Sequence, residues 1–522
     1  MFLSEQTNWI VQKFGGTSVG KFPDKIVDDI IKNYSQSQGK NVSVVCSARS
    51  TYTKAEGTTS RLLKCCELAS QENDYNSIVE IIRQDHVANA ENFIINPVLQ
   101  TQLVTDTNKE LDMVVKYLDA SKILGEVSIR TMDLVMSVGE KLSCLFMAAL
   151  CNDRGVKAKY VDLSHIIPSD YTIQAENVLD NTFYSFLVTA LKDELKPFVE
   201  SKEKIVPIFT GFFGLIPMGL LNGVGRGYTD LCAALIAVAL NADELQVWKE
   251  VDGIFTADPR KVKTARLLDS VTPEEAAELT YYGSEVIHPF TMEQVIRAKI
   301  PIRIKNVQNP TGNGTMIYPD NIARKGENTP PHPPEVFTPS FYERKRRGAT
   351  AITTKHDIVV INIHSNKKTL SHGFLAQIFT ILDKFKLVVD LISTSEVHVS
   401  MALPIPDNDS NKSLKLAVTD LKRLGQVDII RDMAIVSLVG KQMKQFIGIA
   451  GTMFTTLAEQ NINIEMISQG ANEINISCVI AESDSLKALQ SIHLNLLDPL
   501  RKEKSFSVAV DERLEQLKRM EL

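Results

Sequence analysis

Apolar runs of strand length alternate with helical patterns along the chain up to Asn306. This alternation predicts a mostly parallel β-sheet covered by helices. In such a sheet, ligands bind beyond the carboxyl ends of the strands. The strand-like runs begin at Trp9 and cover 41–48, 204–214, 244–253 and 300–306, and the amphipathic stretches between them include 231–240 and 291–298.

The last third of the chain repeats one pattern at a distance of 75 residues. Each copy has a strand, a glycine (Gly373 or Gly448), an apolar pattern at helical spacing, a short strand that ends in Ile-Ser and an alternating strand. This order, present twice, is typical of ferredoxin-like regulatory modules. The alternative is a coincidental pair of α+β segments, and the identical phase of the two copies argues against it.

The composition changes near Arg324, where proline and charge increase and periodicity ends. Such a segment is typical of a linker or an exposed connection. We interpret its basic run at 344–347 as solvated rather than as a partner site. The predicted organisation is an α/β domain over 9–325, a linker over 326–348, modules over 358–430 and 432–500, and a C-terminal helix or tail over 501–522, with a strand near 349–357 as a candidate part of the second module.

Charge and cysteine usage exclude several classes of protein. The net charge is −6, whereas a protein that binds nucleic acid usually has a basic excess. The seven cysteines form no C-x-x-C pair and no zinc-type pattern with histidine, so we expect free thiols, a reducing compartment and no metal ligated by the protein.

The sequence also shows no signal for a membrane or an organelle. The N-terminus carries an acid and no long apolar run, which predicts no targeting peptide. The longest apolar run, 231–240, is half of the ~20 residues needed to span a bilayer. We therefore expect a cytoplasmic protein that contacts no membrane.

The segment 11–22, VQKFGGTSVGKF, nearly matches a phosphate-binding P-loop. A P-loop continues after its lysine, here Lys21, with Ser or Thr, which holds magnesium at the start of a helix. Phe22 cannot ligate magnesium, and Pro23 favours a helix that begins only after the lysine. The segment is therefore not a P-loop.

A different lysine, Lys13, stands at the end of an apolar strand, just before Gly15, Gly16 and Ser18. In that position its side chain would point into the crevice beyond the strand. The glycines would expose backbone N–H groups to an anion. The pattern predicts a phosphate site whose lysine precedes its glycines, and the alternative is a strand-ending turn with a solvated lysine.

Further motifs follow in a recognisable order. After KFGGTSVG come VVCSA with TTSRLL, then SVGEKLS, TGFFG, GRGYTDLCAALIA, WKEVDGIFTADPR and YYGSEVIHP. Together they resemble the motifs of aspartate kinases, in the amino-acid kinase superfamily, and the C-terminal repeat resembles the paired ACT modules of these enzymes. The likeness extends over nearly the whole chain and is greatest to monofunctional enzymes of the fungal type.

The resemblance implies an αβα sandwich around a mostly parallel sheet, followed by two βαββαβ ACT modules. It implies transfer of the γ-phosphoryl group of ATP to the β-carboxylate of L-aspartate, as the first step toward threonine and methionine, with Mg²⁺ carried on the phosphates. An aspartate side chain titrates near ~3.9, so no general base is required. The remaining task is to position two anions and to neutralise charge on the transferring group.

The resemblance assigns catalytic roles to Lys13, Asp230 and Arg226. Lys13 would bridge to the phosphates and Asp230 would organise Lys13, although an acid at that helix start is also favoured by the helix dipole. Arg226 would clamp the α-carboxylate of aspartate, a task that suits a guanidinium. Its alternative is an arginine in a surface turn.

The other substrate contacts also follow from the resemblance. Glu140 would accept the α-ammonium group, with a solvated helix carboxylate as the alternative. Ser47 and Thr59 would supply hydroxyl groups, and Thr58 is the alternative to Thr59.

The nucleotide would contact two groups of residues. Bacterial relatives have Thr-Asp at the positions of Lys249 and Glu250, and often a lysine at the position of Glu285, so the resemblance leaves the base and ribose contacts open. His288 could be catalytic or structural, and its place beside a proline turn favours a structural role. The full predicted ATP set is Lys13, Gly15, Gly16, Ser18, Lys249, Glu250, Phe255, Arg260, Glu285 and Val286.

In the second ACT module, a helix N-terminus could hold the carboxylate of an effector amino acid. By resemblance to fungal relatives the effector is L-threonine, bound at a module interface in a homo-oligomer. A purely structural dimerisation domain is the alternative. The predicted residues are Gly448, Ile449, Ala450, Asn463, Ile464, Asn472, Glu473 and Asn475.

Three other functions remain possible from the sequence. Glutamate kinase uses similar chemistry, and a substrate panel separates it from aspartate kinase. A UMP kinase would lack the ACT pair. A regulatory amino-acid sensor with an inactive kinase domain is the alternative from another class, and the presence of Lys13, Glu140, Arg226 and Asp230 argues against it.

Overall fold

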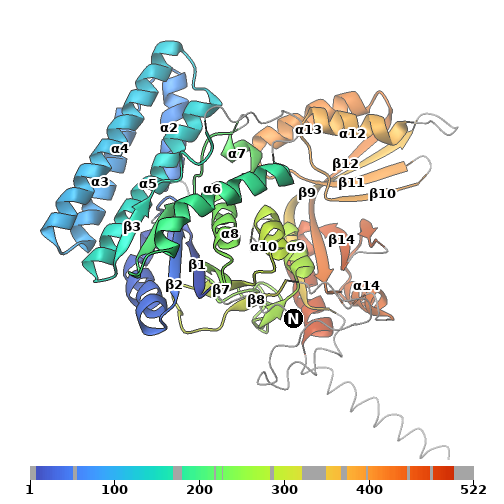
Figure 1. Ribbon diagram of the computed structural model, residues 1–522. Helices are drawn as coiled ribbons and strands as arrows, with labels where there is room; N and C mark the ends of the chain where they lie inside the picture. Colours follow the sequence, from blue (N-terminus) through green and yellow to red (C-terminus); the bar gives the residue numbers. More distant parts are fainter. Residues whose placement is uncertain are drawn as a thin grey trace, which may run out of the picture. The chain divides into compact units, whose positions relative to one another are not determined.

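The computed structural model describes residues 7–50, 56–168, 179–216, 219–225, 227–282, 287, 289–319, 349–365, 373–395, 398–441, 443, 447–470 and 474–498. The chain forms two compact units (Figure 1). The first unit comprises Met1–Ile254, Asp269–Pro273 and Ile287–Ile322, and the second comprises Phe255–Leu268, Glu274–Val286 and Ala323–Leu522. The predicted linker and C-terminal tail lie outside the described residues.

The first unit is built on an eight-stranded sheet in the order β3-β4-β2-β1-β5-β7-β8-β6. All neighbours are parallel except β7 and β8, which confirms the mostly parallel sheet. All six residues of the central strand β1 are buried, as expected for a strand covered on both faces. The strands are β1 Trp9–Phe14, β2 Asn41–Cys46, β3 Ala158–Val161, β4 Val206–Thr210, β5 Glu244–Lys249, β6 Ser270–Val271, β7 Ile302–Asn306 and β8 Thr315–Ile317.

Helices cover both faces of this sheet. Phe14, Val44 and Trp248 enter one core with the inner faces of η1 and α5, while α8 packs against β1. The helices of the unit are α1 Gly16–Lys21, η1 Lys25–Ile31, η2 Asn33–Ser37, α2 Thr58–Ser70, α3 Asn76–Phe93, α4 Pro97–Leu124, α5 Ile129–Asp153, α6 Asn181–Val199, α7 Leu220–Gly223, α8 Tyr228–Leu240 and α10 Pro289–Arg297.

Two expectations about helices need correction. A short helix, α1, already begins at Gly16, before the helical run that starts at Pro23. The stretch 231–240 is not amphipathic, because α8 is buried almost all round between the sheet, α6 and α10. Helix α5 has the length and apolar composition of a membrane span, but 78% of that apolar window is buried inside the protein, as in a core helix.

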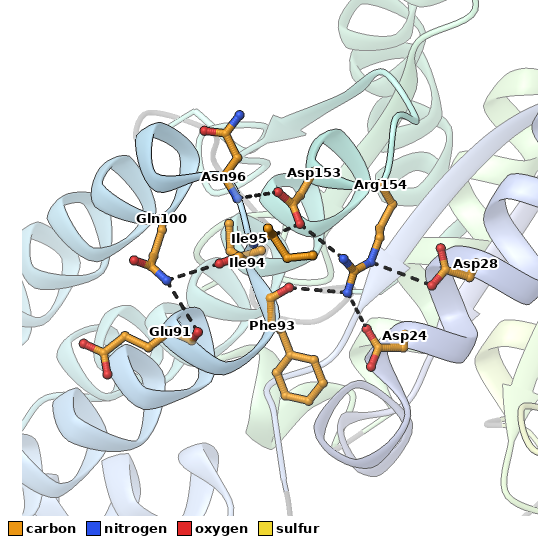
Figure 2. A network of polar contacts seen from close by, with 10 residues as sticks. All are labelled: Asp24, Asp28, Glu91, Phe93, Ile94, Ile95, Asn96, Gln100, Asp153 and Arg154. Atoms are coloured by element: carbon orange, nitrogen blue, oxygen red, sulfur yellow. Dashed lines mark hydrogen bonds and ion pairs between the residues drawn. The ribbon is translucent and has the colours of Figure 1, made fainter.

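Asp153 and Arg154, at the C-terminal end of α5, fasten three segments of the first unit together (Figure 2). The Asp153 carboxylate accepts hydrogen bonds from the backbone N–H groups of Ile95 (3.1 Å) and Asn96 (2.8 Å) in the turn between α3 and α4. Arg154 extends to Asp24, with 3.0 Å between Nη2 and Oδ1. The network therefore joins α5, the α3–α4 turn and the helical run after Pro23.

We expect Asp153→Ala to destabilise the first unit by about 1–3 kcal/mol, because it removes the acceptor of two backbone N–H groups and one of the acidic partners of Arg154. Urea unfolding measures this change. Asp28→Ala is the matched control, since Asp28 is 42% exposed and lies 3.8 Å from Arg154 Nε, and an exposed pair contributes little. Equal stability of the two variants would contradict this role for Asp153.

The second unit contains one antiparallel six-stranded sheet in the order β10-β11-β9-β12-β14-β13. Its strands are β9 Ala351–Ser365, β10 Leu391–Thr394, β11 His398–Pro404, β12 Gly425–Val439, β13 Met466–Ser468 and β14 Asn475–Ala481. Its helical segments are α9 Pro273–Tyr281, α12 Phe374–Lys384, α13 Asn408–Leu421, α14 Ile449–Glu459, η5 Glu482–Asp484, α15 Ser485–Ile492 and η6 His493–Leu497.

The two copies of the repeat share this sheet. In each copy a left-handed glycine, Gly373 or Gly448, precedes the first helix, with φ of 83° and 88°. Strands β9 and β12 are long enough to belong to both copies, and their pairing shifts register near Met433. The repeated β-α-β-β order is thus confirmed, with two halves joined edge to edge.

Candidate functional site

Lys13 lies near the carboxyl end of β1, where the sequence predicts it. It is 9% exposed, and its Nζ lies 2.5 Å from Oδ1 of Asp230. Asp230 occupies the first turn of α8, where a carboxylate is favoured by the helix dipole. The structure therefore joins the predicted lysine and the predicted acid across 217 positions of sequence in one nearly buried ion pair.

Glu140 lies on α5 and is 2% exposed, so it is not a solvated helix carboxylate. Its Oε1 accepts a hydrogen bond of 2.6 Å from the hydroxyl of Thr229, the residue before Asp230. Burial raises the pKa of Glu140 to about 7, against the lowering effects of hydrogen bonds from Thr229 and Tyr228 and of the charge of Lys13. The first turn of α8 thus connects Lys13 with Glu140.

Thr229 and Gly211 are site residues that the sequence analysis did not single out. A Cβ atom on Gly211, which follows β4, would lie 2.4 Å from Cγ2 of Thr229 and 2.9 Å from Oε2 of Glu140. Only glycine leaves room for this pair. The signal in the sequence was the position of each residue inside a motif, TGFFG or GRGYTD.

The glycine-rich segment after β1 has two different faces. At Gly15 an added Cβ atom would meet nothing within 4 Å, whereas at Gly16 it would lie 2.0 Å from the carbonyl oxygen of Ala48. Gly16 is therefore required for close packing on the loop after β2, and Gly15 has space beside it for a ligand. The hydroxyl of Ser18 donates to Oε1 of Glu250 at 2.7 Å, so the structure brings together two residues of the predicted ATP set.

Of the predicted substrate hydroxyls, Ser47 follows β2 directly and donates its backbone N–H to the carbonyl of Phe14 at 3.1 Å. Thr58 is buried, and its hydroxyl is 3.1 Å from Nε2 of His86. Thr59 is only half-buried. Because the Thr58 hydroxyl has an internal partner, the geometry favours Thr59 as the group available to a substrate.

The remaining nucleotide residues are divided between the units. Lys249 ends β5 and Glu250 follows it, both in the first unit, whereas Phe255 and Arg260 belong to the second. Phe255 forms a β-bridge with Leu267, and Arg260 pairs with Asp258 and is 88% exposed. Arg226, Glu285, Val286 and His288 lie outside the described residues, so their predicted roles stay predictions.

In the second unit, Gly448 precedes α14, and Ile449 and Ala450 form its first turn. Asn463 donates to Glu465 at 2.7 Å, while Ile464 is half-buried. Asn475 is 4% exposed and donates to Glu278 of α9, so its amide already has an internal acceptor. Asn472 and Glu473 lie outside the part of the chain that the structure describes. The effector site stays a prediction.

The segment 255–268, predicted as a nucleotide loop, is packed on the second sheet. Ala257 and Val262 enter a core with residues of α14 and α15. The backbone N–H of Ile352 donates to the carbonyl of Thr256 at 2.9 Å, and the hydroxyl of Thr256 is 2.8 Å from Nε2 of His493. No local pattern in the sequence indicates this attachment, which places Phe255 and Arg260 in the second unit.

Comparison with known proteins gives the same picture. The profile of the amino acid kinase family matches residues 8–306, and that of an ACT domain matches 436–496. The aspartokinase of Saccharomyces cerevisiae is 77% identical over 520 residues, which are 99% of this chain and 98% of that protein.

Two solved structures of Escherichia coli aspartokinase III are similar over 94% of this chain and 100% of theirs, at 26% sequence identity. One, in complex with aspartate and ADP (R-state), has a TM-score of 0.70. The other, in complex with lysine and aspartate (T-state), has a TM-score of 0.71.

Proposed function

This chain belongs to the amino acid kinase family and, within it, to the aspartate kinases, and we propose that it converts L-aspartate and ATP into 4-phospho-L-aspartate and ADP. The observation that carries the proposal is the connection of Lys13, Asp230 and Glu140 through the first turn of α8. The first turn of α8 thereby sets the distance between Lys13, a cation suited to bind phosphate, and Glu140, an anion suited to bind an ammonium group.

The chemistry needs little more than this arrangement. The β-carboxylate of aspartate is the nucleophile and is ionised at neutral pH, so the protein need not remove a proton. Lys13 stabilises the negative charge that the reacting phosphoryl group and carboxylate bring together, and Asp230 fixes the direction of its ammonium group. Glu140 binds the α-ammonium of the substrate. Gly15 faces the phosphates with the open space beside it, and Gly16, whose Cα packs on the loop after β2, offers its backbone N–H group. Mg²⁺ on the phosphates would neutralise charge there.

The remaining predicted residues complete the substrate site in this proposal. Arg226 binds the α-carboxylate bidentately, and Ser47 and Thr59 hold the substrate by their hydroxyl groups. Lys249, Glu250, Phe255, Arg260, Glu285 and Val286 contact the nucleoside.

The test is ADP release by the purified chain with magnesium-ATP and either L-aspartate or L-glutamate. We expect turnover with L-aspartate and little with L-glutamate. Turnover only with L-glutamate would replace the proposal by glutamate kinase. Folded protein without turnover on either substrate would favour the amino-acid sensor.

We further propose that L-threonine binds the second ACT module and inhibits the enzyme in a homo-oligomer, as feedback on the first step toward threonine and methionine. The segment 255–268 supports this coupling, because it carries two predicted nucleotide contacts and is packed on the sheet of the second unit. In this proposal, a change at that sheet alters the predicted contacts of Phe255 and Arg260 with the nucleotide, because both residues lie in this segment.

Linkage makes this proposal testable. If threonine favours a state with poor affinity for aspartate, then aspartate and a non-hydrolysable ATP analogue must weaken threonine binding by the same factor. Isothermal titration of threonine with and without these ligands measures the factor. An unchanged threonine affinity would contradict coupling through binding, and binding of a different amino acid in the same assay would identify another effector.

A further inference from the structure

The loop at residues 47–50, which follows β2, is held between α1 and α5. On one side, the backbone N–H of Ser50 donates to the carbonyl of Gly16 at 2.9 Å. On the other side, the N–H of Arg49 donates to the hydroxyl of Ser143 on α5 at 2.8 Å. Since α5 also carries Glu140, the loop lies beside the proposed substrate site.

The side chain of Arg49 connects this loop to α2 and α3. It is 7% exposed, and its Nη1 lies 3.0 Å from Oδ2 of Asp85 on α3. The same oxygen receives Nη1 of Arg61, on α2, at 3.2 Å. The carbonyl of Arg49 also accepts the N–H of Thr58, the first residue of α2, at 3.0 Å. One carboxylate therefore holds the loop and the first turns of α2 together.

His86, next to Asp85, also contacts the start of α2. We call the contacts of Asp85 and His86 with the 47–50 loop and α2 the joint. Its Nε2 is 3.1 Å from the hydroxyl of Thr58. Burial, assisted by the positive charge of Arg49, lowers the pKa of His86 to about 3. The imidazole therefore stays neutral at physiological pH and keeps the Thr58 hydroxyl engaged, which leaves Thr59 as the neighbouring hydroxyl.

We propose that Asp85 is a positioning residue for the amino-acid substrate. The two hydroxyls assigned to aspartate, those of Ser47 and Thr59, each stand two positions before one of the arginines that Asp85 holds. Fixing both arginines on one carboxylate fixes the separation of the two hydroxyls. Lys13 and Gly15 do not take part in the contacts of this joint, and the 47–50 loop meets the predicted ATP set through the carbonyl of Gly16, so we expect a larger effect on aspartate than on the nucleotide. The inference rests on the proposed function.

Asp85→Asn is the direct test, because asparagine keeps the shape and removes the charge that holds both guanidiniums. We expect the KM for L-aspartate to rise about tenfold or more, since small misplacements of binding groups are costly. The KM for magnesium-ATP should stay within about twofold and kcat should change little, as expected for lost binding of one substrate alone. Arg61→Gln should also raise the KM for aspartate. If Asp85→Asn does not fold, this second variant tests the proposal in its place.

The matched control is Asp112→Asn. Asp112 pairs at 2.8 Å with Arg83, on the same helix as Asp85, and Arg83 also donates to Asn108 of α4 at 2.6 Å, so these contacts join α3 to α4. All kinetic constants should be unchanged in this variant. Equal rises in both KM values of Asp85→Asn, or a lower melting temperature with an unchanged KM for aspartate, would overturn the proposal. Wild-type turnover with L-aspartate is measured first, so a failure of the proposed function is seen separately.

Discussion

Replacing Lys13 by alanine should lower kcat by at least about a hundred- to thousandfold, the cost of removing one preorganised donor from a reacting anion. Lys13 is nearly buried and held by Asp230 at 2.5 Å, so its ammonium group is fixed before the substrates arrive. ADP release under saturating aspartate and ATP measures the loss. The melting temperature should also fall, because Asp230 loses its cation, so circular dichroism must first show that the variant is folded.

Lys21→Ala is the matched control for this experiment. Lys21 is the lysine that would bind phosphate if the segment 11–22 were a P-loop, and it is exposed at the end of α1. We expect its removal to leave kcat nearly unchanged. Loss of activity in Lys21→Ala with normal turnover in Lys13→Ala would reverse the assignment of the two lysines.

The second large effect should appear as a pH dependence set by Glu140. Burial is the main cause that raises its pKa to about 7. Only the ionised carboxylate attracts the α-ammonium of aspartate, and this form is lost as the pH falls through 7. We therefore expect kcat/KM for aspartate to fall about tenfold per unit of pH below that value, because kcat/KM follows the ionisation of the free enzyme.

Two variants separate this effect from other titrations. Glu140→Gln should give a low kcat/KM for aspartate, and its plot of log(kcat/KM) against pH should lack the bend near pH 7. Thr229→Val should move the bend to higher pH, because the hydrogen bond from Thr229 lowers the pKa of Glu140. The same bend in Glu140→Gln as in the wild type would show that another group titrates.

Much of the first unit could be predicted because its strands are buried on both faces. Such strands appear in the sequence as continuous apolar runs. The predicted strand end at Lys13 and the predicted helix start at Asp230 are both found in the structure. The hydrogen bond between Thr229 and Glu140 could not be predicted, because 89 positions of sequence separate the two residues. Each is also a residue type that is common on the solvent-exposed face of a helix. Close approach at Gly211 likewise depends on the packed side chains.

The packing of segment 255–268 on the second unit also could not be predicted from the sequence. Ala257 and Val262 are ordinary apolar residues of a loop, and nothing local shows which core they enter. The sequence analysis predicted two modules and a strand near 349–357 as a candidate part of the second, and residues 351–355 do pair with 435–439 of β12. It did not predict that this strand continues into the first module as β9, because strand pairing over long separations is set by the folded chain.

The most direct test of the central claim is to trap the product of the wild-type chain with hydroxylamine, which converts an acyl phosphate into a stable hydroxamate. With magnesium-ATP and L-aspartate we expect one β-aspartyl hydroxamate for each ADP released, and neither product above background in Lys13→Ala. ADP without hydroxamate, or equal hydroxamate from Lys13→Ala, would contradict phosphoryl transfer to the substrate carboxylate at this site.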